Sequence, residues 1–212
     1  MFAKKIMTAL CLSIISLGAA ADADNQGWFV GGKIGQVDAH TKYTIDRDFT
    51  YSENETAGWF AIYGGYNFSE WFGLEGNVFA TDNLADGARD EDTTASDARY
   101  SGLAITPKFT WQVSPDFSLF AKGGMTFLSY KKEYRSHGYW DYNYDYSWDG
   151  IVLTYGVGAQ INVGHGVVFR LGFDVTKGSL DREDEDRYEP ISLDFDVDAK
   201  LKQTSLGVHY QF

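Results

Sequence analysis

Six charged residues stand out because each lies in a stretch where apolar and polar residues alternate. They are Lys33, Glu75, Lys108, Lys122, Arg170 and Asp174. Alternate side chains of a strand point to opposite faces, so these charges should face away from their apolar neighbours. Charges removed from water persist only when opposite charges and hydrogen bonds surround them. The sequence therefore predicts an internal salt-bridge network, in which Glu75 has several cations available and Arg170 can hold a carboxylate through two hydrogen bonds.

Two roles are open for this network. As a gate, its ion pairs would block a lumen and exchange partners to let small ions pass. As a polar plug, they would only fill the interior and fix the register of the strands. The plug is the interpretation that we favour.

The residues around these charges follow a period of two, which is typical of half-buried strands. Eight segments of about ten residues show it, the length that a tilted strand needs to cross a membrane. They lie near 28–35, 60–68, 72–78, 103–111, 119–127, 153–161, 169–175 and 205–212. In lipid every backbone amide must pair within the protein, so the sheet must close. The predicted fold is all-β, an eight-stranded antiparallel up-and-down transmembrane β-barrel.

The connections between these segments are sorted by length. Three are short, at 69–71, 114–116 and 164–166, and four are long and polar, at about 38–56, 82–99, 131–148 and 178–197. Short turns at one end and long extracellular loops at the other are typical of outer-membrane barrels. A soluble lipocalin-like barrel is the alternative, but it would turn its apolar face inward. The sequence therefore favours the outer membrane of a Gram-negative cell.

The N-terminus is predicted to be an export signal. Lys4 and Lys5 precede an apolar run, Ile6–Ala20, that is too short to span a bilayer as a helix. Cleavage is expected after Ala21, with Ala23 as the alternative, so that residues 1–21 (or 1–23) are the signal peptide and 22–212 the barrel domain. The only cysteine, Cys11, lies in this signal, so the mature chain should contain no disulfide.

The formal net charge is −12, and it becomes −14 without the signal, which carries two lysines and no acid. Such a balance argues against nucleic acid as a partner. The histidines His40, His137, His165 and His209 form no catalytic motif, so no enzymatic activity is predicted. No metal site and no cofactor are predicted. The acidic run 181–196 has no EF-hand spacing, and a solvated surface is favoured over bound Ca²⁺ or cation bridges to lipopolysaccharide.

Several short motifs resemble one family in their order along the chain. They are Trp28–Gly35 (WFVGGKIG), Gly64–Tyr66 (GGY), Gly73–Glu75 (GLE), Lys122–Met125 (KGGM), Arg170–Leu171 (RL) and Ser205–Phe212 (SLGVHYQF). Together they resemble the transmembrane domain of outer-membrane protein A, the OmpA-like eight-stranded barrels. The resemblance implies that Lys33, Glu75, Lys108, Lys122 and Arg170 form the internal salt-bridge network of that family.

The sequence departs from the family pattern at two places. Gln160 stands where the sixth strand of the family holds a carboxylate, which leaves the partner of Lys108 open. The chain ends at Phe212, so the periplasmic peptidoglycan-binding domain of longer members is expected to be absent. The terminal Tyr210 and Phe212 resemble the signal that the barrel-assembly machinery recognises. Partners during biogenesis would then be that machinery and periplasmic chaperones, and afterwards outer-membrane lipid and lipopolysaccharide around a monomer.

A specific role would reside in the loops. Tyr139, Trp140, Tyr142 and Tyr144 in the third loop are residue types that dominate binding surfaces, although stacking within a hairpin explains them as well. The first hypothesis is a non-enzymatic barrel that contributes to envelope structure or surface interaction, with at most small-ion conductance. The alternatives are a porin-like channel for small solutes and an adhesin or receptor for a host or surface ligand.

Overall fold

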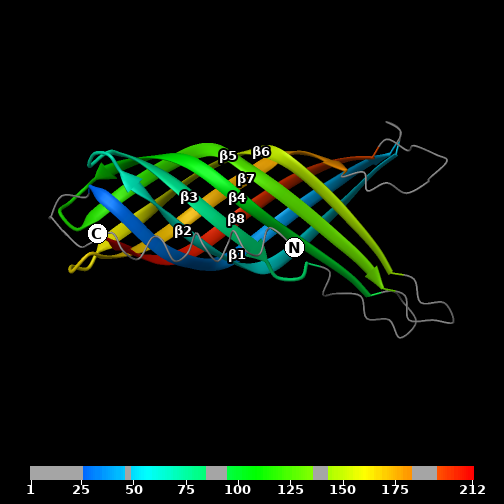
Figure 1. Ribbon diagram of the computed structural model, residues 1–212, viewed down its shortest axis with the longest axis horizontal. Helices are drawn as coiled ribbons and strands as arrows, with labels where there is room; N and C mark the ends of the chain where they lie inside the picture. The colour runs from blue at the N-terminus through cyan, green and yellow to red at the C-terminus, as the bar shows by residue number, and fades with distance from the viewer. Residues whose placement is uncertain (1–25, 46–48, 85–94, 136–142, 183–194) are drawn as a thin grey trace, which may run out of the picture.

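The computed structural model describes residues 26–45, 49–84, 95–135, 143–182 and 195–212. Eight strands follow one another within these residues: β1 (Gly27–Ile45), β2 (Phe49–Asn67), β3 (Phe72–Thr81), β4 (Ala95–Gln112), β5 (Phe117–Arg135), β6 (Asn143–Asn162), β7 (Val167–Arg182) and β8 (Phe195–Gln211). Each strand pairs antiparallel with the next, and β8 pairs with β1 (Figure 1). The predicted closed, up-and-down barrel is confirmed. None of the described residues forms a helix that is long and apolar enough to cross a membrane.

Three short turns lie at one end of the barrel, which we call the turn end, at 68–71, 113–116 and 163–166. The third turn has a positive φ at Gly164, His165 and Gly166, a conformation that glycine adopts without steric cost. At the opposite loop end, β5 and β6 project beyond the cylinder on one side, and β1, β2, β7 and β8 on another (Figure 1). The three short turns thus lie together at one end as predicted, but the first of the four connections predicted to be long, residues 46–48 between β1 and β2, is no longer than those turns.

The apolar side chains of the strands face outward. Ile34, Trp111 and Ile151 are 68%, 72% and 74% exposed. The adjacent residues Lys33 and Val152 point into the barrel and are buried. Burial along β3 alternates residue by residue. A barrel in water would hide these apolar side chains, so this apolar belt is the arrangement of a barrel in lipid.

Seven of the eight strands are longer than the ten-residue segments predicted from the sequence, and β3 has ten residues. β1 and β2 each span 19 residues and β6 spans 20. The assignment of 38–56 and 131–148 to loops is therefore wrong for most of each range, because pairing continues to Ile45 opposite Phe49 and to Arg135 opposite Asn143. Within 82–99 and 178–197 the strands take only 95–99, 178–182 and 195–197. Beyond the apolar belt the outward side chains become polar, so the sequence looks like a loop although strand alternation persists.

The interior has two layers of different chemistry. Toward the turn end and in the middle it is polar and charged, with Glu75, Thr106, Lys108 and Thr126 at 0–1% exposure. Toward the loop end the inward side chains form one apolar and aromatic cluster that includes Val37, Trp59, Tyr100, Leu128, Tyr130, Trp148, Leu180 and Leu201. The alternation thus inverts along the barrel, from apolar outside within the belt to apolar inside beyond it.

Candidate functional site

The charged layer is built around Glu75, which the alternation of β3 turns into the lumen. Its carboxylate is fully buried and accepts one hydrogen bond at each oxygen. Lys122 Nζ donates to Oε1 at 3.0 Å, and Arg170 Nη1 donates to Oε2 at 2.6 Å. The Nη2 atom of Arg170 is buried without a hydrogen-bond partner. The two-hydrogen-bond contact that the sequence allows for Arg170 is therefore not the contact seen with Glu75.

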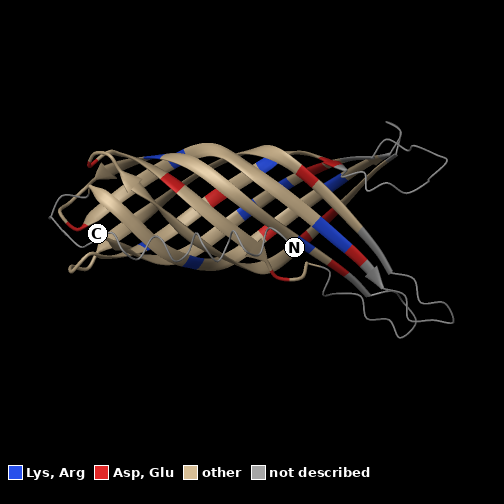
Figure 2. Ribbon diagram, viewed as in Figure 1, with Lys and Arg blue, Asp and Glu red and all other residues tan. Residues whose placement is uncertain are grey.

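Asp174 is the second carboxylate of the layer. Its Oδ2 lies 3.1 Å from Lys122 Nζ and 3.4 Å from Lys33 Nζ. Lys122 therefore bridges Asp174 and Glu75, and a continuous chain of ion pairs runs from Arg170 to Lys33. Its members come from β1, β3, β5 and β7, because inward residues of alternate strands meet at one level of a barrel. In Figure 2, acidic and basic positions are interspersed along the strands of the barrel.

Lys108 on β4 lies outside this chain, although it is almost fully buried. Among the residues that the structure describes, no carboxylate lies within ion-pair distance of its ammonium group. Instead, Nζ lies 4.5 Å from the centre of the Phe29 ring. The Arg170 guanidinium likewise lies 4.0 Å from the centre of the Phe120 ring. The faces of aromatic rings attract cations, so they supply part of the compensation that carboxylates would give.

The four cations of the layer thus face two carboxylates, and Gln160 stands at the place left open by the sequence. Gln160 on β6 lies directly opposite Arg170 on β7 in the strand register. The side-chain oxygen Oε1 of Gln160 is buried without a hydrogen-bond partner. A carboxylate here would add the missing negative charge. We expect Gln160→Glu to raise the free energy of unfolding by about 1–2 kcal/mol, measured by urea titration of the refolded barrel.

The control for this change is Gln112→Glu, which alters the same chemical group at an exposed position near the turn end. It should leave the unfolding midpoint within about 0.5 kcal/mol of the parent protein. A lower urea midpoint for Gln160→Glu would show that the buried cations of the charged layer do not stabilise a carboxylate at residue 160.

Polar contacts also fill the turn end of the interior. Tyr63 and His209 share a hydrogen bond of 2.9 Å between Oη and Nδ1, and both side chains are buried. Closer to the turns, Asn67 Nδ2 donates to Gln211 Oε1 at 3.0 Å. The lumen is therefore occupied by side chains below the ion pairs as well as at their level.

Sequence reasoning missed the second closure, an aromatic plug at the loop end formed by Tyr43, Tyr100, Tyr130, Tyr146 and Trp148. The rings of Tyr100 and Tyr130 stack with centres 4.5 Å apart, and Trp148 stacks on Tyr130 at 5.5 Å. Tyr43 and Tyr130 join their hydroxyl groups at 2.8 Å. The signal for these residues was the alternation that continues through 98–104 and 126–132, hidden by the polar residues between them.

The Glu53 carboxylate lies above the plug and joins it to the surface. Lys132 Nζ donates to both Glu53 oxygens at 3.2 Å, and Tyr43 Oη donates to one of them at 3.3 Å. Burial, together with the neighbouring Glu53, raises the pKa of the Glu55 carboxyl. The loop end is thus sealed by phenols and capped by a partly buried ion pair.

Burial also raises the pKa of the phenols of Tyr43, Tyr100 and Tyr130. An unfolded chain loses such protons near pH 10, whereas the folded plug keeps them. Their contribution to stability is therefore complete below about pH 10 and is lost as the pH rises toward the folded pKa. We expect at least three of the 14 tyrosines to resist ionisation at about pH 11, measured by tyrosinate absorbance. Complete ionisation with the strand circular dichroism retained would contradict this.

Comparison with known proteins identifies the family. A family model described as "Outer membrane protein beta-barrel domain" matches residues 7–212. The chain belongs to this family. The barrel is therefore a small, OmpA-like outer-membrane barrel, located in the Gram-negative outer membrane, and its apolar belt faces lipid. Among curated proteins, none matches the chain.

Solved structures share the fold of this outer-membrane barrel at low sequence identity. Neisserial surface protein A is 11% identical with a TM-score of 0.57, covering 92% of this chain and 100% of its own. OprG of Pseudomonas aeruginosa is 12% identical with a TM-score of 0.52, covering 89% and 98%. Ail, the attachment invasion locus protein of Yersinia pestis, solved with the heparin analogue sucrose octasulfate, is 19% identical with a TM-score of 0.50, covering 88% and 99%.

The remaining predicted site residues of this outer-membrane barrel are spread over both ends. Tyr139, Trp140 and Tyr142 lie outside the described residues, and Tyr144 lies on β6. Tyr210 lies on the outer face near the turn end, where its ring contacts that of Phe212. No three His, Cys, Asp or Glu side chains within 26–45, 49–84, 95–135, 143–182 and 195–212 are grouped to hold a metal ion. Most of the acidic run 181–196 lies outside these ranges, and so do residues 1–23, which the sequence predicts to be a signal peptide.

Proposed function

We propose that this protein is a non-enzymatic outer-membrane barrel that contributes to envelope structure and presents surface segments, with a lumen closed to solutes. The observation that carries the proposal is the double closure of the interior. The ion pairs around Glu75 fill its middle, and the aromatic plug fills it again toward the loop end. A porin-like channel for small solutes needs an aqueous path, and eight strands leave an interior that side chains can fill.

Conductance across a planar lipid bilayer tests this proposal. The refolded protein should give no channel steps, and neither should Glu75→Ala, because the aromatic plug remains in place. A variant that also carries Tyr100→Ala and Tyr130→Ala should conduct small ions. Heat-modifiable gel migration checks that each variant is folded. Steady, solute-sized conductance of the parent protein would contradict a closed lumen and favour the channel.

A surface-binding role is the second candidate, because the β5–β6 hairpin projects from the loop end and leads directly to the aromatic segment 139–142 (Figure 1). The solved Ail structure holds a sulfated heparin analogue, but the net charge of −12 disfavours such an anionic ligand for this chain. Replacing Tyr139, Trp140, Tyr142 and Tyr144 with Ser should abolish adhesion of expressing cells to a host surface. Unchanged adhesion with the variant folded in the membrane would exclude this role.

A further inference from the structure

A small internal cavity lies beside the chain of ion pairs, and we call it the β8 cavity. Its charged lining residues are Lys33 of β1, Lys122 of β5, and Arg170 and Asp174 of β7. Its volume of about 10 Å³ is just enough for one particle of the size of water. The cavity can therefore hold a water molecule or, with a small shift of its walls, a monatomic ion. A phosphate, a sulfate or an organic molecule is too large for it.

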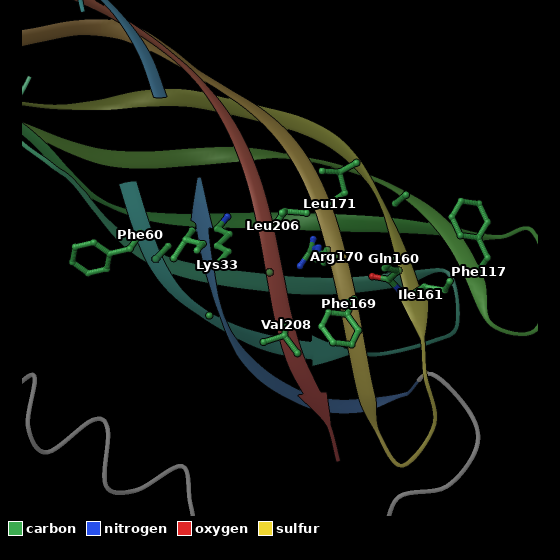
Figure 3. A pocket seen from close by; sticks show the side chains of 15 residues that line it. Lys33, Phe60, Phe117, Gln160, Ile161, Phe169, Arg170, Leu171, Leu206 and Val208 are labelled. Atoms are coloured by element: carbon green, nitrogen blue, oxygen red, sulfur yellow. The ribbon is translucent and has the colours of Figure 1, made fainter. Parts of the chain in front are cut away.

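Two glycines create the β8 cavity. Lys33 of β1 and Arg170 of β7 are both directly opposite Gly207 of β8, which places no side chain between the two cations. Figure 3 shows Lys33 and Arg170 on either side of β8. Gly172 is the next inward residue of β7 after Arg170, and it lies opposite Ser205 of β8. The space between the two cations is therefore not filled by the strand that separates them.

The β8 cavity is surrounded by more positive than negative charge. Three of its lining residues are cations, and Asp174 is the only carboxylate among its described lining residues. The Oδ2 atom of Asp174 already contacts Lys122 and Lys33. Its Oδ1 atom lies against Gly156 of β6, whereas the described lining residues come from β1, β5, β7 and β8. Because buried cations need compensating charge, an anion fits the cavity better than a neutral water molecule does.

The lining also supplies hydrogen-bond donors for an anion. Arg170 Nη2 is buried without a hydrogen-bond partner among the residues that the structure describes. Ser205 contributes a hydroxyl group, which can donate one hydrogen bond. Lys33 Nζ lies 3.4 Å from Asp174 Oδ2, which is long for a charge-assisted hydrogen bond, and an ammonium group has three hydrogen atoms to donate. A guanidinium, an ammonium and a hydroxyl group thus meet at one cavity.

We propose that the β8 cavity binds a chloride ion, which lies between Arg170 and Lys33 and joins them across β8. The chain of ion pairs begins at Arg170 on β7 and ends at Lys33 on β1, so that only β8 separates its two ends. The chloride ion closes this chain into a ring of alternating charge around the lumen. It also lowers the surplus of positive charge that the four buried cations of the layer create.

Chloride-dependent stability tests the proposal. The refolded barrel is unfolded with urea in sodium chloride or in sodium gluconate at the same ionic strength, because gluconate is too large for the cavity. A ligand that binds only the folded protein stabilises it by mass action. At a chloride concentration tenfold above its dissociation constant, the urea midpoint should therefore rise by roughly 0.5 M or more.

Gly172→Ala fills the cavity without changing any charge. The added Cβ would lie 3.1 Å from its nearest atom, Ser205 Oγ, so the methyl group occupies the space of the ion. The control is Gly76→Ala on the lipid-facing side of β3, where the nearest atoms would be 3.9 Å away. Gly172→Ala should lose the chloride response, and Gly76→Ala should keep it. Equal chloride responses of Gly172→Ala and the parent protein would overturn the proposal, because a general salt effect acts on both.

Gln160→Glu replaces the ion by a fixed carboxylate, which keeps the test decisive if Gly172→Ala does not refold. Gln160 lies directly opposite Arg170, and Figure 3 shows its side chain pointing toward β7. A glutamate here competes with chloride for Arg170, so the chloride-induced rise of the midpoint should be smaller than in the parent protein. Gln112→Glu, at an exposed position, should keep the full rise. A full rise in Gln160→Glu would overturn the position of the ion beside Arg170.

Anomalous X-ray scattering locates the ion directly. Bromide has the charge of chloride and nearly its size, and it scatters anomalously. Crystals of the parent protein grown in sodium bromide should show an anomalous peak between Arg170 and Lys33, and crystals of Gly172→Ala should not. Density without an anomalous signal at this place would identify a water molecule and overturn the proposal.

Discussion

Glu75→Ala is expected to lower the free energy of unfolding of this barrel by roughly 3–5 kcal/mol. Among the residues that the structure describes, the substitution removes the only carboxylate in ion-pair contact with Arg170 and one of the two in contact with Lys122. Both cations would stay buried among the strands with less compensation. Breaking a buried ion pair on one side is costly because an uncompensated charge stays behind. Urea titration of the refolded protein, followed by tryptophan fluorescence, measures the change.

The control for Glu75→Ala is Glu70→Ala, which removes an exposed carboxylate from the first short turn. It should change the stability by less than about 0.5 kcal/mol. Glu75→Gln adds a second comparison, because the amide keeps the size of the side chain but carries no charge. A loss below about 1 kcal/mol for Glu75→Ala would show that water enters the interior and hydrates the two cations.

Gly156→Val is expected to be at least as damaging, with a loss of about 3 kcal/mol or more. Gly156 faces the lumen directly opposite Asp174, and a Cβ here would overlap Asp174 Oδ1 and lie 2.7 Å from Phe173 O. The valine would displace the carboxylate from Lys122 and Lys33 and push β7 away from β6. The expected result is failure to refold, or a barrel that loses heat-modifiable migration at a lower temperature.

Gly123→Val is the matched control on the neighbouring strand. Gly123 faces lipid, and the closest atoms to an added Cβ would be 3.9 Å away. This variant should refold with near-parent stability, because the side chain meets only lipid. Equal stability of the two variants would show that Asp174 has another position available and that the ion-pair chain is not constrained by the strand beside it.

The local pattern determined the faces of the strands with high fidelity. Lys33, Lys122 and Arg170 each stand between apolar residues, and a period of two places them inward in any register. Which cation meets which carboxylate was beyond that pattern. The pairing of Lys122 with both Glu75 and Asp174 depends on the stagger between neighbouring strands, and no single strand encodes it.

The loop-end parts of the strands were the hardest feature to predict from the sequence. Tyr43, Tyr100 and Tyr130 come from β1, β4 and β5, and each sits among polar residues that face water beyond the lipid. The polar residues in these segments point outward into water. The aromatic plug consists of inward side chains that come from different strands. Only the closed sheet brings these three rings together.

Lys177 and Lys200 show the same division. The alternation of residues along β7 and β8 places both side chains away from the lumen. The tertiary structure decided that Lys177 and Lys200 lie directly opposite each other on neighbouring strands. Strand periodicity specifies direction because side chains alternate, but proximity across strands follows from register, which is set when the whole barrel closes.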